Sequence, residues 1–249
     1  MYNIQAVGEC ELENMQMKYT ETIGVVGGMG SYATMDFFRR ILEAFPAEKE
    51  WDRPRIVIDN RCTMPSRVRA ILYHEEVNTI INELACAVRG LLDCGADHLI
   101  FACNTSHAFV HDVVQLVPEA GPKIIHIIDT LAQRFQENKI SSAYLIASEG
   151  TLESNIYQDF FDQYGITLQI PGPDSWPQLR EFIEIVKQGQ VKPEARERFC
   201  QYCAEIPHEN IILGCTEFPV LLSAGELKCG KKVWDPLDSA IDHIKTIIK

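Results

Sequence analysis

Short apolar runs alternate with longer stretches in which apolar residues recur at helical spacing, as Phe37, Phe38 and Ile41 do. The apolar runs predict strands at 22–26, 54–59, 97–102, 123–127, 142–147, 166–170, 210–213 and 232–234. The amphipathic stretches predict helices at 31–45, 75–94, 104–116, 179–188, 194–205 and 237–248, and one more from Asp129. Strands that alternate with helices predict parallel sheets flanked by helices, in which ligands bind beyond the carboxyl ends of the strands.

The second half of the chain repeats the order of the first. A strand, a glycine turn, a hydroxyl residue, a helix and the tripeptide Asp-Phe-Phe follow Ile23, and they recur after Ala143, which lies 120 positions later. Cys215 follows Cys103 by 112 positions, which is nearly the same offset. Two landmarks with similar offsets indicate an internal duplication. We therefore predict an α/β fold of two pseudo-symmetric domains, each a mainly parallel sheet flanked by helices, with an active site in the cleft between them.

The predicted domain limits follow from this repeat. Residues 1–21 are polar and acidic without periodicity. We interpret them as an N-terminal extension, and disorder is one way to account for their composition. Residues 22–128 form the expected first domain, and residues 129–236 form the second. The closing helix, 237–249, is expected to pack back on the first domain.

Composition narrows the function. The formal net charge of −12 argues against a nucleic-acid partner, because such surfaces are basic. No apolar run approaches the ~18 residues of a membrane span, and the first twenty residues do not resemble a secretory signal. Nine scattered cysteines fit a reducing cytoplasm better than a disulfide framework. Three of them, Cys62, Cys86 and Cys94, are interpreted as packing residues.

Two of the apolar runs end in a cysteine that is followed by a polar residue and a predicted helix. The first is Cys103 and the second is Cys215. A thiol at the start of a helix lies in a partial positive field, which favours the thiolate. His107 and Glu217 are near enough in sequence to tune these thiols. One such thiol in each half predicts an enzyme that moves a proton across a small substrate.

Other candidate motifs are less specific. The segment Gly28-x-Gly30-x-x-Ala33 loosely matches a dinucleotide fingerprint, but the acidic residue that this motif requires after the next strand is misplaced. A tight turn with close backbone approach is the simpler interpretation. Arg61, Arg67 and Arg69 cluster beyond the second strand. An arginine there suits a carboxylate, although a solvated loop charge is the simpler interpretation for any one of them.

The motifs Gly27-Gly28-Met29-Gly30, Cys103-Asn104-Thr105 with His107, and Gly214-Cys215-Thr216-Glu217 together resemble the aspartate/glutamate racemase family. The resemblance runs from about Thr22 to Ile248 and includes Asp235-Pro236. It implies racemisation of amino acids, typically acidic ones, without pyridoxal phosphate, metal or any other cofactor. It implies that Cys103 and Cys215 are the acid/base catalysts. It implies substrate contacts at Ser66, Arg67, Asn104, Thr105, Ser106 and Lys187.

Chemistry adds to this resemblance. Removal of a weakly acidic α-proton requires a positioned base together with stabilisation of the developing charge. One thiolate would take the proton, and the opposite thiol would return one on the other face. Asn104, Thr216 and the backbone N–H groups of the helix starts would meet charge on the α-carboxylate. Arg67 and Lys187 would hold a side-chain carboxylate.

The chain departs from the family pattern in two places, and several alternatives stay open. Ser31-Tyr32 stands where the family usually has proline, and Ser66 stands where it often has aspartate. The amino acid that serves as substrate is therefore open. The alternatives are a related two-cysteine isomerase or decarboxylase of another small carboxylic acid, a non-catalytic binding protein for a small acid, and a thiol redox sensor. The resemblance also favours a homodimer.

Overall fold

The computed structural model describes residues 18–222 and 231–249. Most of the predicted N-terminal extension, residues 1–17, lies outside the described residues. The end of that extension is held to the other terminus, because the backbone N–H groups of Thr20 and Glu21 both donate to the carbonyl of Lys249. The two ends of the described chain therefore lie side by side.

The first sheet has three parallel strands in the order β2-β1-β3. They are β1 (Thr22–Gly27), β2 (Arg55–Asn60) and β3 (His98–Phe101). Every residue of β1 is buried, because helices cover both faces of the sheet. The elements around it are α1 (Ser31–Ala44), η1 (Glu50–Asp52), α2 (Arg67–Tyr73), α3 (Val77–Asp93), η2 (Thr105–Phe109), α4 (Val110–Leu116) and η3 (Pro118–Lys123).

The second sheet has four parallel strands in the order β5-β4-β6-β7. They are β4 (Ser142–Ala147), β5 (Thr167–Gln169), β6 (Asn210–Gly214) and β7 (Lys232–Trp234). The accompanying elements are α6 (Glu149–Glu153), α7 (Ile156–Phe161), η4 (Asp162–Tyr164), η5 (Pro173–Ser175), α8 (Trp176–Lys187), α9 (Pro193–Glu205) and α10 (Phe218–Leu222). In both sheets the first strand is central, the second lies on one side and the third on the other. This shared order confirms the predicted fold of two similar α/β halves.

The expected strand at 123–127 is reduced to one bridge between Leu99 and Ile124, because η3 ends at Lys123 and α5 (Ile127–Glu137) begins at Ile127. The predicted helix 75–94 is confirmed as α3, but the short helix α2, which precedes it, was not predicted. His74 and Glu76, which have φ values of 57° and 55°, separate the two helices, because the left-handed conformation interrupts a helix.

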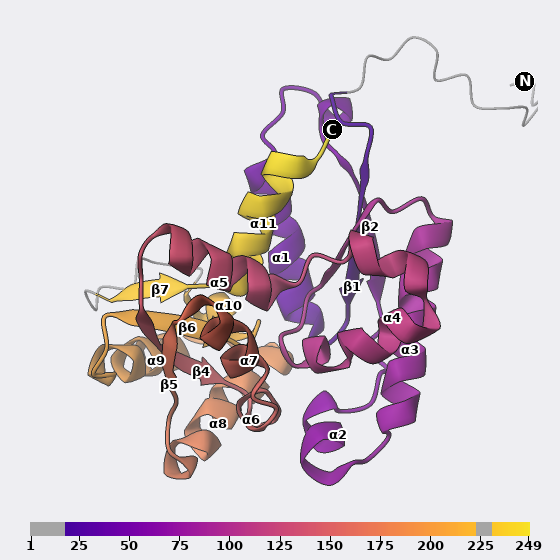
Figure 1. The fold of residues 1–249 in the computed structure, drawn as a ribbon. Coiled ribbons are helices and arrows are strands. Elements are labelled where there is room, and N and C mark those ends of the chain that lie inside the picture. Colours follow the sequence, from indigo (N-terminus) through magenta and orange to yellow (C-terminus); the bar gives the residue numbers. More distant parts are fainter. Residues whose placement is uncertain (1–17, 223–230) are drawn as a thin grey trace, which may run out of the picture.

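The closing helix α11 (Pro236–Ile247) lies between the halves (Figure 1). It packs mainly on α5 and also contacts α1 and β6. Its buried residue Ile244 belongs to a hydrophobic core that includes Ile23 from the first sheet and Leu145 from the second. The helix therefore packs on both halves, rather than on the first alone. Two further apolar clusters each belong to one half.

In the part of the chain that the structure describes, no helix combines the length and the apolar character that crossing a bilayer requires.

Candidate active site

Cys103 and Cys215 lie just beyond the carboxyl ends of equivalent strands. Cys103 follows β3, and Cys215 directly follows β6. Their exposed fractions are 6% and 8%. A negative charge on Cys103 is among the causes that raise the pKa of Cys215. The structure thus places each predicted thiol, buried, just beyond the carboxyl edge of the sheet in its own half.

The thiol of Cys215 has a carboxyl partner. Its Sγ donates a hydrogen bond to Oε2 of Glu217 over 3.0 Å. Burial raises the pKa of Cys215 well above its usual value, and the charge of Glu217 and this hydrogen bond raise it further. Lys187 acts in the opposite direction. The prediction that a helix start favours the thiolate is therefore wrong for Cys215, because burial and a neighbouring acid outweigh it.

Glu217 is itself buried, with 2% of its surface exposed. Burial raises the pKa of its carboxyl group, whereas the Cys215 hydrogen bond and the charges of Lys187 and Arg67 lower it. Its Oε1 has no hydrogen-bond partner among the described residues. A Cβ at Gly30 would lie 2.6 Å from this oxygen. The glycine turn after β1 is therefore needed for close approach of Glu217, as the turn interpretation predicts.

The surroundings of Cys103 are different, because its neighbours bond to its backbone rather than to its sulfur. Ser106 Oγ donates to the Cys103 carbonyl over 2.8 Å, and His107 Nδ1 lies 2.9 Å from the same oxygen. The Ile127 N–H donates to His107 Nε2, which fixes a neutral ring with its proton on Nδ1. Burial lowers the pKa of His107 to about 4. His107 and Ser106 therefore hold the turn after β3.

Cys103 is also followed by the 3₁₀ turn η2 (Thr105–Phe109), which precedes α4, rather than directly by an α-helix.

Asn104 and Thr105 connect this turn to the second half. Asn104 Oδ1 accepts a hydrogen bond from the hydroxyl of Tyr157 over 2.5 Å, and Asn104 Nδ2 is buried without a partner among the described residues. Thr105 Oγ1 lies 3.0 Å from Ser148 Oγ and 2.8 Å from Thr151 Oγ1. Sequence reasoning missed Ser148, Thr151 and Tyr157. The repeat contained a signal for the first two, because they flank the turn that corresponds to the glycine turn after β1.

The predicted carboxylate ligands Arg67 and Lys187 already have partners. Arg67 donates through Nη1 to the carbonyls of Met64 and Pro65, and through Nη2 to that of Met29. Only its Nε is buried and unpaired in the described structure. The predicted two-oxygen clamp is therefore not preformed, because the guanidinium fork holds backbone carbonyls. Lys187 Nζ donates to Glu184 Oε1 over 3.2 Å.

Ser66 and Thr216 complete the predicted set. Ser66 caps α2, where its Oγ accepts from the Arg69 N–H over 3.3 Å. Thr216 is buried, and its hydroxyl lies 3.4 Å from Glu217 Oε2. Thr216 therefore belongs with Cys215 and Glu217, whereas Ser66 is exposed at the rim.

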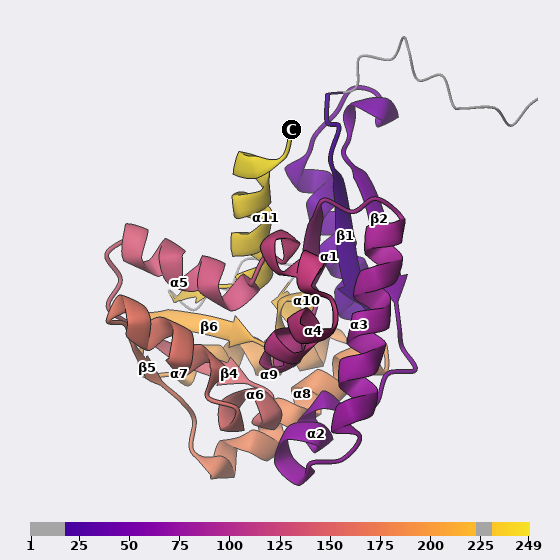
Figure 2. The ribbon, with the colours of Figure 1, turned by 45° about the vertical axis from the view of Figure 1, so that its right-hand side comes forward.

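A cavity of about 290 Å³ lies between the halves and is lined by residues of α2 and α8 and by the start of α6. Figure 2 shows α2 beside α6 and α8. Ser66 and Lys187 line it, but neither cysteine does. Gly150 makes this junction close, because a Cβ there would lie 2.9 Å from Cα of Val68. The cavity therefore joins two of the predicted substrate contacts, Ser66 from the first half and Lys187 from the second.

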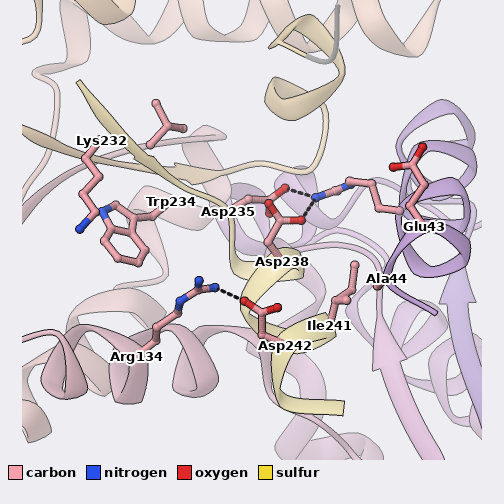
Figure 3. A pocket seen from close by; sticks show the side chains of 11 residues that line it. Glu43, Ala44, Arg134, Lys232, Trp234, Asp235, Asp238, Ile241 and Asp242 are labelled. Carbon is pink, nitrogen blue, oxygen red and sulfur yellow. Dashed lines mark hydrogen bonds and ion pairs between the residues drawn. The ribbon is translucent and has the colours of Figure 1, made fainter. Parts of the chain in front are cut away.

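A larger cavity, of about 590 Å³, lies between α1, β7 and α11 and contains none of the predicted site residues. In Figure 3, Asp235 and Asp238 point toward one guanidinium, that of Arg40, and Arg134 pairs with Asp242. Asp235 also caps α11 by accepting from the Leu237 N–H. The Arg40 pairs therefore join α1 to the start of α11, the Arg134–Asp242 pair joins α5 to α11, and the cavity is a structural junction.

No group of three or more His, Cys, Asp or Glu side chains within residues 18–222 and 231–249 has a geometry that could hold a metal ion.

Comparison with known proteins identifies the family to which this chain belongs. Residues 26–244 match the family described as Asp/Glu/Hydantoin racemase. The chain belongs to this family. Its membership confirms the predicted family resemblance and an isomerase of the racemase type. A solved structure, Picrophilus torridus aspartate racemase, superposes with a TM-score of 0.78 and 26% identity, and the match covers 91% of this chain and 94% of that one.

Sequence relatives agree with the family assignment. The broad specificity amino-acid racemase RacX of Bacillus subtilis is 23% identical over 207 residues, which cover 80% of this chain and 87% of RacX. A glutamate racemase of Clostridium perfringens strain SM101 is 29% identical over 165 residues, which cover 65% of this chain and 61% of that protein. These relatives carry names with different substrates, so the family alone does not select one.

Proposed function

We propose that this protein is a cofactor-independent amino-acid racemase that acts on aspartate or glutamate through Cys103 and Cys215. The observation that carries the proposal is the placement of two buried thiols just beyond equivalent strand ends of the two halves. The aspartate and glutamate racemases among the relatives support the substrate class. The proposal includes a homodimer, which the resemblance favours, and a cytoplasmic location, which the scattered cysteines favour.

The proton transfer starts from the hydrogen bond between Cys215 and Glu217. Glu217 accepts the Cys215 proton, which leaves a thiolate and a neutral carboxyl group. The thiolate removes the α-proton of the substrate, and the electron pair of the broken C–H bond passes toward the α-carboxylate. Cys103 S–H then gives its proton to the opposite face of the carbon, which inverts the centre. In the reverse direction Cys103 is the base and Cys215 is the acid, and solvent exchange restores the starting protonation state.

The unpaired buried donors suit the substrate carboxylate. Asn104 Nδ2 and Arg67 Nε each lack a partner in the described structure, and an unpaired buried donor costs about 1–3 kcal/mol. Carboxylate oxygens would satisfy both donors and would gain strength as negative charge develops. Lys187, at the cavity rim, is the proposed contact for the side-chain carboxylate, and it would exchange Glu184 for the substrate.

The test is α-proton exchange in heavy water. Each L-amino acid is incubated with the protein, and proton NMR follows loss of the α-proton signal while chiral chromatography follows the D-enantiomer. We expect exchange together with inversion for aspartate or glutamate. Retention of every α-proton across the amino acids would reject the racemase. Binding of an acid that persists unchanged in Cys215→Ser, without any exchange, would instead support the binding-protein alternative.

A further inference from the structure

The bond between Tyr157 and Asn104 crosses from one half of the molecule to the other. Tyr157 lies in α7 and is fully buried, and its hydroxyl lies 2.5 Å from Asn104 Oδ1. Asn104 directly follows Cys103. We propose that Tyr157 is a positioning residue that orients the Asn104 amide, so that Nδ2 is presented to the substrate carboxylate. This inference rests on the proposed function.

The direction of the hydrogen bond follows from the protonation of the phenol. Burial raises the pKa of Tyr157 well above its usual value, and the charges of Asp235 and Cys215 raise it further. The hydroxyl therefore keeps its proton and donates it. An amide has its acceptor oxygen and its donor nitrogen on opposite sides, so the bond to Oδ1 fixes where the NH₂ group points.

The consequence for Asn104 is an unusual environment. Only 2% of its surface is exposed, and Nδ2 has no partner among the described residues. A buried amide that could rotate would move its donor toward any available acceptor. Tyr157 prevents this rotation and so keeps the donor available for a ligand. A preorganised donor contributes most where charge develops in the transition state, because it does not have to reorganise then.

The contact of Tyr157 with the site is made through the amide. Its hydroxyl donates to Asn104, the residue directly after Cys103. The charge on Cys215 is also among the causes that raise the pKa of the phenol. Tyr157 therefore acts through Asn104.

The experiment is a double-mutant cycle on Tyr157→Phe and Asn104→Ala, in which kcat and KM are measured for the L-amino acid that exchanges. We expect Tyr157→Phe to lower kcat at least about tenfold with a smaller change in KM, against about 100-fold for Asn104→Ala. In the Asn104→Ala background, Tyr157→Phe should have no further effect, because the group through which it acts is gone.

Tyr164→Phe is the matched control, because its hydroxyl donates to Asp129 Oδ1 on another helix. It should retain the wild-type kcat. Thermal unfolding identifies variants that fail to fold. If Asn104→Ala is one of them, Asn104→Asp replaces it, because it keeps the acceptor for Tyr157 but lacks the NH₂ donor. There too, Tyr157→Phe should have no further effect on kcat.

Two results would overturn this inference without affecting the proposed function. One is an unchanged kcat in Tyr157→Phe. The other is an equal loss of kcat from Tyr157→Phe in the wild type and in the Asn104 variant, because it would indicate a role independent of the amide. If the wild type exchanges no amino acid at all, the proposed function fails and this inference fails with it. The wild-type measurement therefore separates the two.

Discussion

Cys103 and Cys215 occupy equivalent places in the two halves, but their surroundings differ in kind. The Cys215 sulfur donates to a buried carboxyl group, whereas the Cys103 carbonyl, and not its sulfur, accepts from Ser106 and His107. The repeated strand order thus supplies two thiols, and the residues after each strand give them different chemistry. Cys215 has a proton acceptor of its own, and Cys103 has a rigid backbone support.

The most severe test of this comparison removes each thiol in turn. Cys103→Ser and Cys215→Ser should each lower racemisation by at least about a thousandfold, because a hydroxyl is a far weaker acid than a thiol and both faces need a catalyst. Steady-state rates with both enantiomers provide the measurement. Cys62→Ser, at an exposed cysteine, is the control and should match the wild type. Full activity in either active-site variant would contradict the two-thiol mechanism.

A second test concerns the support of Cys103. The pKa of His107 falls to about 4 in the fold, from an ordinary value of 6.5. Between these two pH values the unfolded chain protonates His107 more readily than the folded chain does. The free energy of unfolding therefore falls as the pH drops from 6.5 toward 4. We expect the stability difference between the wild type and His107→Gln to shrink by about 2 kcal/mol from pH 7 to pH 5.

Urea unfolding at the two pH values measures this difference. The comparison with the variant matters, because burial raises the pKa of Asp235 to about 6 and so favours folding at lower pH. The Asp235 contribution is the same in the wild type and in His107→Gln, so it cancels from the stability difference between them. A constant difference between them would show that His107 is not buried as a neutral ring.

A third test removes the proton acceptor of Cys215. Glu217→Gln should lower kcat/KM about 10- to 100-fold, because the thiol loses its base. It should also lower the pKa of Cys215, since the carboxylate charge raises that pKa. The pH–rate profile should therefore shift to lower pH. The loss in kcat/KM must be equal for both enantiomers, because their equilibrium constant is one. Glu75→Gln, at an exposed ion pair with Arg69, is the control.

The smallest expected effect comes from Lys187→Met. Lys187 lowers the pKa of Cys215, so its removal should raise that pKa and shift the pH–rate profile to higher pH. We expect a several-fold lower kcat near neutral pH that recovers at higher pH, together with a higher KM at every pH because the proposed contact with the side-chain carboxylate is lost. If the pH–rate profiles of Lys187→Met and Glu217→Gln shift in opposite directions, the charged neighbours of Cys215 are what distinguish it from Cys103. A shift in the same direction for both would contradict the electrostatic account of Cys215.

Much of the architecture was predictable because it depends on local pattern. The strand at Asn210–Gly214 and its terminal Cys215 followed from an apolar run and a glycine, and the repeat predicted the matching order of the sheets. The expected strand at 123–127 was wrong, because neighbouring turns limit it to a single bridge. Cys62, Cys86 and Cys94 were expected as packing residues, but all three are exposed. Cys86 lies in α3 and Cys94 caps it, and this helix buries its other face.

The site was less predictable, because its decisive contacts join distant residues. Arg67 was expected to bind a carboxylate, but Met29, brought near by the fold, supplies one of its carbonyl partners. The contact of Tyr157 with Asn104 could not be predicted from the sequence, because the two residues lie 53 positions apart.

The sequence by itself determined two α/β halves with a thiol beyond one strand of each, because apolar periodicity and strand-end residues are local properties of the chain. The tertiary structure decided which neighbours those thiols received. It buried Glu217 against Cys215, turned His107 toward a backbone carbonyl and set Tyr157 behind Asn104. The physical reason is that acidity and hydrogen bonding depend on burial and short distances, which exist only after the halves have packed together.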